Sequence, residues 1–164
     1  MDRICVRKGL SPHMGSIEHL AIYVNEKRLD EYLVERIGKE YLGLIPAWLD
    51  YYDDSYAPSR REKEYVWEQT QLCHDTRVLP VLLCPDDFDF SCTVVIVEVT
   101  DKGEFVHWNR FGIDCTEFEP EEDIFPQYIG KNQKWFDGIG PFEFKKSEYV
   151  QCIKAFCTSF GTDN

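Results

Sequence analysis

Three carboxylates lie between two thiols in the segment CPDDFDFSC, which runs from Cys84 to Cys92. Asp86, Asp87 and Asp89 follow directly on an apolar run. Carboxylates and thiols at the end of a strand can bind a metal ion or take part in acid–base catalysis. They can also form a solvated turn, or an acidic surface that binds a basic partner.

The calcium-loop pattern does not fit this segment. With Asp87 at position 1 of the loop, Asp89 fits position 3, but position 12 is Glu98, inside a predicted strand, and the glycine of position 6 is missing. In an extended chain the two aspartates share one side, while Phe88 and Phe90 share the other. The pattern therefore predicts a turn followed by a half-buried extended stretch, with its acids facing solvent or a partner.

The remaining cysteines and histidines do not have the close paired spacing of zinc ligands. Cys73 and His74 are direct neighbours, and Cys152 and Cys157 are five residues apart on a predicted helix. No cysteine stands in a small-residue turn at a helix start, where its thiolate would be favoured. The glycine patterns of phosphate-binding loops are not found, and GIGP at 138–141 is predicted to be a tight loop. We therefore expect no catalytic residue, no metal site and no cofactor.

Acidic residues gather in two further stretches, of which the first is rich in aromatic residues. Asp50, Asp53 and Asp54 stand among one tryptophan and three tyrosines, and the ten residues 114–123 contain six acids and neither lysine nor arginine. Aromatic residues supply contact area at interfaces, and the charges around them set partner choice and association rate. The predicted partner-binding residues are Asp86, Asp87, Asp89, Asp53, Asp54, Tyr51, Tyr52, Tyr56, Glu121, Glu122 and Asp123.

The elements that must position these residues alternate between strands and helices. Val95, Val97 and Val99 alternate with Val94 and Ile96, which predicts a strand covered on both faces. Thr100–Gly103 then has the residues of a hairpin turn. Strands are predicted over 17–24, 78–83, 93–99 and 104–111, and helices over 29–41, over 59–72 and from Ser147 onward.

The two outer predicted helices each carry an apolar stripe. In the first helix the stripe is Leu29, Leu33 and Ile37, and in the last helix it contains Val150, Ile153, Cys157 and Phe160. The order of elements predicts a single α+β domain over 1–164, with an antiparallel or mixed central sheet and helices packed mainly on one face.

The bulk composition limits the classes of function. The chain has 164 residues, with 18 basic and 30 acidic side chains and a net charge of −12, which disfavours binding to nucleic acid or to an anionic membrane. The seven cysteines are odd in number and scattered, which argues against a disulfide framework. The sequence contains no apolar stretch of membrane-spanning length and no signal-peptide pattern. We expect a cytoplasmic protein that is a monomer or a weak dimer.

The stretches LLCPDDFDFSCTVVIVEV, HWNRFG and WFDGIGPFEF, together with the compact acidic character, resemble small immunity proteins of bacterial polymorphic-toxin and contact-dependent inhibition systems. The resemblance implies that the chain binds and neutralises a cognate toxin, often a basic nuclease, and that it is not an enzyme. The alternative function is a small metal-dependent or thiol hydrolase that uses the carboxylates of Asp86, Asp87 and Asp89.

Overall fold

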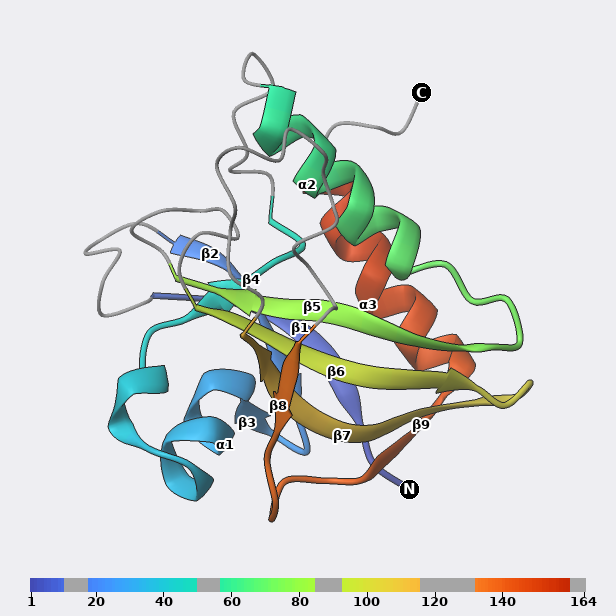
Figure 1. The fold of residues 1–164 in the computed structure, drawn as a ribbon. Helices are drawn as coiled ribbons and strands as arrows, with labels where there is room; N and C mark the ends of the chain where they lie inside the picture. The colour runs from blue at the N-terminus through green and yellow to red at the C-terminus, as the bar shows by residue number, and fades with distance from the viewer. Residues whose placement is uncertain (11–17, 50–56, 85–92, 116–131, 160–164) are drawn as a thin grey trace.

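The computed structural model describes residues 1–10, 18–49, 57–84, 93–115 and 132–159. Strands and helices follow one another along the chain (Figure 1). Their order is β1 (Ile4–Leu10), β2 (Glu18–Val24), β3 (Lys27–Arg28), α1 (Leu29–Arg36), a 3₁₀ turn (Lys39–Tyr41), β4 (Ile45–Pro46), α2 (Ala57–Gln69), β5 (Thr76–Leu83), β6 (Val94–Asp101), β7 (Phe105–Asp114), β8 (Gln133–Trp135), β9 (Phe142–Lys145) and α3 (Lys146–Ser159).

The main sheet has the strand order β4-β5-β6-β7-β8, and β9 also pairs with β7. All of its pairings are antiparallel, and one cross-strand row runs from Leu79 through Val97 to Phe111. The predicted alternation in β6 is confirmed, because Val94, Ile96 and Val97 are all at most 1% exposed. A strand that is buried on both faces needs apolar residues at successive positions, and β6 has them.

The smaller sheet contains β1, β2 and β3, also antiparallel, with Cys5 opposite Tyr23. The strand predicted at 17–24 and the turn after it are confirmed, since Asn25 and Glu26 have the positive φ angles of a tight turn. The first strand, β1, was not predicted. Its later residues Arg7 and Lys8 interrupt the apolar pattern because they lie on exposed parts of an edge strand.

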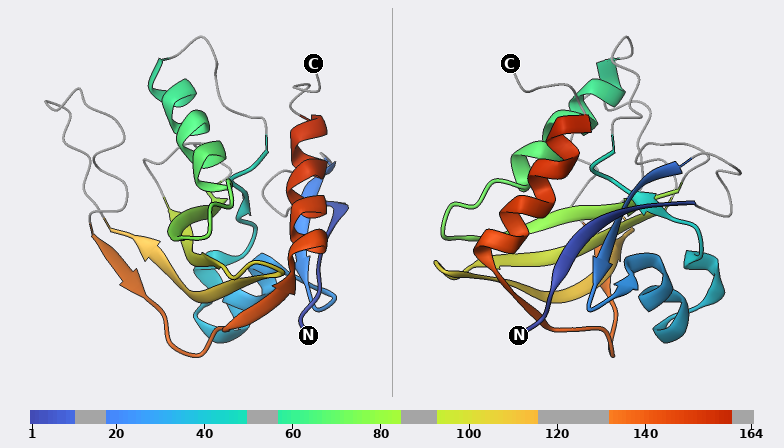
Figure 2. Two further views of the ribbon diagram at one scale, coloured as in Figure 1. Left: turned by 90° about the vertical axis from the view of Figure 1, so that its right-hand side faces the viewer. Right: turned by 180° about the vertical axis from the view of Figure 1, so that it is seen from behind.

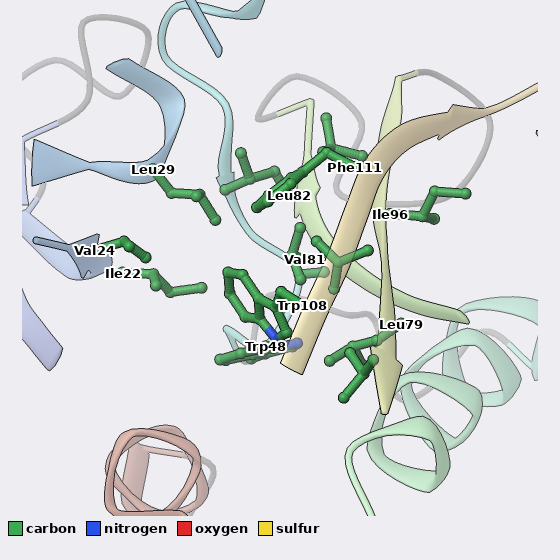
Figure 3. Close-up of a cluster of buried hydrophobic side chains, with 14 of the residues drawn as sticks. Ile22, Val24, Leu29, Trp48, Leu79, Val81, Leu82, Ile96, Trp108 and Phe111 are labelled. Carbon is green, nitrogen blue, oxygen red and sulfur yellow. The ribbon is translucent and has the colours of Figure 1, made fainter. Parts of the chain in front are cut away.

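The core lies between the two sheets (Figure 3). Val81, Trp108 and Phe111 of the main sheet point toward Ile22 and Val24 of the smaller sheet, whereas Ile96 points away to the other face (Figure 3). Trp108 makes edge-to-face ring contacts, with centroids 5.5 Å from Phe111 and 5.1 Å from Phe144. The core thus fixes β7 at the centre of the molecule.

The helices pack on different strands. Helix α3 lies against β1 and β9, α2 against β5, and α1 against β2 and β3 (Figures 1 and 2). This arrangement confirms the predicted α+β fold with an antiparallel sheet. None of the described helices has both the length and the apolar character needed to cross a membrane.

The apolar stripe predicted for the last helix is wrong by about one position. Among residues 146–156, Tyr149, Cys152 and Phe156 are buried, while Val150 and Ile153 are only half-buried. The side chains of Cys157 and Phe160, the other two residues of the predicted stripe, lie outside the described part of the structure. The cause is the aromatic core: the Tyr149 ring lies 6.2 Å from Trp108, and the Phe156 ring lies 5.4 Å from Trp48. Both stripes have helical spacing, and the one with the larger rings is buried.

The boundaries of all three predicted helices also need correction. Helix α1 ends at Arg36, and a separate 3₁₀ turn follows at Lys39–Tyr41, so the helix predicted over 29–41 is interrupted at Gly38. Helix α2 spans Ala57–Gln69, so it begins and ends a few residues before the predicted range of 59–72. Helix α3 begins at Lys146, directly before the predicted start at Ser147.

Pro80 lies where the sheet tolerates it. On one side β5 pairs with β6, and on the other its partner β4 reaches only Leu82 and Leu83. The register of β5 also shifts between Pro80 and Leu82. Proline has no backbone N–H, and at this position the missing donor costs no pairing to β4.

Candidate functional site

The predicted partner-binding residues all lie outside the part of the chain that the structure describes. Tyr51, Tyr52, Asp53, Asp54 and Tyr56 belong to 50–56, Asp86, Asp87 and Asp89 to 85–92, and Glu121, Glu122 and Asp123 to 116–131. The alternative hydrolase function uses three of the same carboxylates and remains a prediction for the same reason. The structure does give the residues at which these three segments begin and end.

Segment 85–92 starts and ends on two adjacent strands. Leu83, the last residue of β5, pairs with Val94, the first residue of β6. Directly beyond this pair, the N–H of Cys84 donates to the carbonyl of Thr93, with an N···O distance of 3.3 Å. Both ends of the segment are therefore fixed at one end of the main sheet.

Segment 116–131 starts and ends beside it. The last residue of β7 pairs with the first residue of β8. Beyond that pair, the N–H of Cys115 donates to the carbonyl of Asn132 at 2.6 Å. Val95 near the start of β6 pairs with Ile113 near the end of β7, which places both segments at the same end of the sheet.

The third acidic segment, 50–56, does not start from the same place, because β4 runs antiparallel to β5 and leads the chain back along β5, where the N–H of Ala47 donates to the Val81 carbonyl at 2.9 Å. Ile45 of β4 pairs with Leu83 at the end of β5. After β4 the chain stays in the core, because the N–H of Leu49 donates to the Pro46 carbonyl at 3.3 Å and Leu49 is buried. We call the end of the main sheet that is marked by Cys84, Thr93, Cys115 and Asn132 the acidic end.

Charge is divided unevenly between the described residues and the other segments. The segments outside the described part contain 12 of the 30 acidic residues and only 1 of the 18 basic ones. The described residues contain 18 acids and 17 bases, so the net charge comes almost entirely from the other segments. Of those 12 acids, 8 belong to the two segments that start and end at the acidic end, and 3 belong to 50–56.

Tyr65 connects α2 electrostatically to the acidic end. Burial raises the pKa of Tyr65 to about 12, and the negative charge of Asp114, the last residue of β7, adds to the increase. The carboxylate of Asp114 therefore acts on a side chain of α2.

The opposite end of the sheet contains a buried carboxylate, Asp101. The Nζ of Lys146 lies 2.7 Å from its Oδ1, and the backbone N–H groups of His74 and Gly103 donate to its oxygens at 2.9 Å and 3.1 Å. Burial alone would raise the pKa of Asp101, but these donors outweigh burial and hold the pKa at about 2. We call this region, the β6–β7 hairpin with the start of α3, the hairpin end.

A second buried polar cluster lies beside α1. The carboxylate of Asp30 accepts the Gly43 N–H at 2.9 Å and pairs with the guanidinium of Arg28, with Nη2 3.1 Å from Oδ2. Nearby, the Nδ1–H of buried His19 donates to the Leu20 carbonyl at 2.8 Å. The cavity between these groups is only about 10 Å³, which is the size of one water molecule. The cluster is therefore structural, and no spacing in the sequence distinguishes such buried acids from exposed ones.

Within the described ranges, no three His, Cys, Asp or Glu side chains are placed to hold a metal ion together. Cys5, Cys73, Cys115 and Cys152 are free cysteines. Cys84 packs against the core and Cys152 is buried, as expected for cysteines that act as small apolar residues. Burial also raises the pKa of the Cys152 thiol, which keeps it protonated.

Comparisons with known proteins found no match among protein-family models, curated proteins or solved structures.

Proposed function

We propose that this chain is a binding protein that neutralises a basic toxin domain, such as a nuclease, in the manner of an immunity protein. The observation that carries the proposal is that the described residues flanking two acidic segments, 85–92 and 116–131, meet at the acidic end. An enzyme that degrades a polyanion needs a basic cleft, and an acidic surface can cover such a cleft. The proposed contacts are Asp86, Asp87 and Asp89, then Asp53 and Asp54, then Glu121, Glu122 and Asp123, with Tyr51, Tyr52 and Tyr56 as anchors.

The spacing of the strands supports a combined electrostatic effect. Neighbouring strands lie about 4.8 Å apart, so the end of 85–92 at the start of β6 and the start of 116–131 at the end of β7 are separated by about one strand spacing. The Debye length at physiological ionic strength is about 8 Å. The charges that start from these neighbouring points therefore reinforce one another at distances that matter for a protein encounter.

The charge balance of the described residues supports the idea that folding and partner binding depend on different acidic residues. With 18 acids and 17 bases, the described part of the chain has little net charge of its own. Several of its acids are engaged locally, for example Glu98, which lies 3.0 Å from Arg110. Acids that serve association are accordingly expected in the other segments, where changing them leaves the buried core intact.

The proposal is tested first by identifying the partner. The tagged chain is used to capture proteins from its native host at low and high salt, and the bound proteins are identified by mass spectrometry. We expect a basic domain that is released as salt increases and that is lost with the triple variant Asp86→Lys, Asp87→Lys, Asp89→Lys. Capture of the same partner in equal amount by the triple variant would contradict the proposed site.

A matched variant separates local charge from net charge. Glu31, Glu64 and Glu68 are exposed acids on α1 and α2. Changing these three to lysine alters the net charge by the same amount as the triple aspartate variant. We expect capture to be kept by the glutamate variant and lost by the aspartate variant. Equal loss in both would mean that only the overall charge matters.

A further inference from the structure

The hairpin end contains a groove that the proposed function does not use. Its volume is about 720 Å³, which is within the range of small-molecule sites. It lies between the β6–β7 hairpin, the end of β9 and the first turns of α3. The lining residues are Gly103, Glu104, Phe105, Lys145, Lys146, Ser147, Val150 and Lys154.

The lining of the groove combines positive charge with an apolar surface. Lys145, Lys146 and Lys154 contribute ammonium groups, and Glu104 is the one acid among the lining residues. Phe105 and Val150 are half-buried and supply an apolar surface between the lysines. Lys146 is paired with Asp101, and Lys145 and Lys154 add two further positive charges to the lining of a groove in a chain whose net charge is −12.

Buried contacts fix the wall of this groove. The Nζ of Lys146 is held 2.7 Å from the carboxylate of Asp101, which is itself only 6% exposed. The N–H of Lys146 also donates to the carbonyl of Glu104 at 2.9 Å, which ties α3 to the hairpin. The N–H of Lys102 donates to the carbonyl of Phe105 at 2.9 Å and closes the hairpin beneath the apolar surface. The groove is therefore built on ordered groups and does not depend on flexible side chains alone.

We propose that the groove binds a small organic anion that combines a phosphate monoester with a flat apolar ring, the chemical class of the nucleoside monophosphates. Lysine ammonium groups bind phosphate as point charges. Two or three ammonium groups together suit a ligand with a doubly charged phosphate better than a ligand with a singly charged carboxylate. The volume exceeds what inorganic phosphate fills, and the Phe105 ring supplies a surface on which a flat ring can stack. This site is independent of the acidic end and of the toxin-binding proposal.

The test is titration of the full-length protein with adenosine monophosphate, inorganic phosphate and adenosine, followed by calorimetry and by amide chemical shifts. We expect one molecule of adenosine monophosphate to bind per chain and to shift the amides of Gly103, Ser147 and Val150. Inorganic phosphate and adenosine should each bind at least tenfold more weakly, because each lacks one half of the recognised chemistry. Phosphate binding as tight as that of the nucleotide would overturn the role of the ring.

Two charge variants locate the site. The double variant Lys145→Glu, Lys154→Glu should weaken nucleotide binding at least tenfold. The control Lys39→Glu, Lys134→Glu reverses two exposed lysines outside the groove and should leave binding unchanged. Unchanged thermal unfolding of both variants shows that each is folded, and Phe105→Leu tests the ring without altering charge. No saturable binding at millimolar nucleotide, shifts elsewhere in the chain, or equal loss in both charge variants would overturn the proposal.

Discussion

The two ends of the main sheet hold negative charge in different ways. At the hairpin end, Asp101 is buried and its charge is neutralised by Lys146 and by two backbone N–H groups. At the acidic end, the carboxylates belong to segments whose flanking residues are joined by backbone hydrogen bonds such as Cys84 to Thr93. The first arrangement links charge to folding, and for the carboxylates of the second we propose a role in association.

The difference shows why the same residue type has different consequences at each end. Removing one partner of a buried ion pair leaves an uncompensated charge and is strongly destabilising. Removing a solvated carboxylate changes stability very little but changes long-range attraction to a partner. Stability measurements should therefore respond to substitutions at the hairpin end, and association kinetics should respond to those at the acidic end.

The largest expected effect is at the hairpin end. Asp101→Ala should lower the free energy of unfolding by about 3 kcal/mol, because it leaves Lys146 and the N–H groups of His74 and Gly103 without their acceptor. The measurement is urea unfolding at pH 7. The matched control is Asp75→Ala, since Asp75 is half-exposed and pairs with Arg77 at 3.1 Å; its cost should stay below about 1 kcal/mol. Similar costs for the two substitutions would remove the distinction between buried and solvated acids.

The pH dependence of stability tests the same role of the buried, ionised Asp101. The pKa of Asp101 is lowered from 3.8 to about 2 in the folded chain, so its ionised form stabilises the fold by about 2 kcal/mol above pH 4. That contribution is lost as pH falls from 4 through 2, because the carboxylate then becomes protonated in both states. The difference in unfolding free energy between the wild type and Asp101→Asn should shrink over this interval. A difference that stays constant from pH 6 to pH 2 would show that ionisation of Asp101 is not the cause.

A glycine near the acidic end should have a smaller effect. A Cβ atom at Gly112 would lie 2.5 Å from the Lys134 carbonyl oxygen and 2.8 Å from the Trp135 ring, so β7 and β8 approach too closely for a side chain. Gly112→Ala should cost about 1–2 kcal/mol and increase amide exchange at Lys134 and Trp135. At Gly9 a Cβ would meet only the Tyr23 hydroxyl at 3.8 Å, so Gly9→Ala serves as the tolerated control. Equal stability of both variants would contradict the close pairing of β7 with β8.

The smallest effect on stability is expected for the proposed contacts themselves. The triple variant Asp86→Lys, Asp87→Lys, Asp89→Lys should change the free energy of unfolding by less than about 0.5 kcal/mol. Chemical unfolding of this variant beside the wild type gives the comparison. A loss of several kcal/mol would mean that these aspartates are part of the fold, and binding losses could then not be assigned to the interface.

Much of the fold could be predicted from the sequence, because the main strands carry a strong local signal. The valines of β6 and the glycine at the following turn predicted both a buried strand and a hairpin, and Gly103 has the expected positive φ of 89°. Strand β1 has no such signal, since its exposed Arg7 and Lys8 hide the pattern. The buried face of α3 depended on the aromatic partners Trp48 and Trp108, which come from distant parts of the chain.

The candidate sites also differ in how much of each could be predicted from the sequence. Acid clustering is visible in the sequence, and it pointed to segments that start from neighbouring strands. The buried roles of Asp30 and Asp101 were not predictable, because each depends on donors that the fold brings to it: Gly43 to Asp30, and Lys146 and His74 to Asp101. The groove at the hairpin end was missed for the same reason, since Phe105 and Lys154 are far apart in the sequence.

The most direct test of the central claim is the association rate between the captured basic partner and three forms of the chain, measured from 20 to 500 mM salt. The forms are the wild type, the triple aspartate variant, and the variant with Glu31, Glu64 and Glu68 changed to lysine. If the acidic end binds the partner, the association rate should fall steeply with salt for the wild type and for the glutamate variant. For the aspartate variant, the association rate should be at least tenfold slower than that of the wild type at low salt and nearly independent of salt. A wild-type rate and salt dependence that survive unchanged in the aspartate variant would contradict the account.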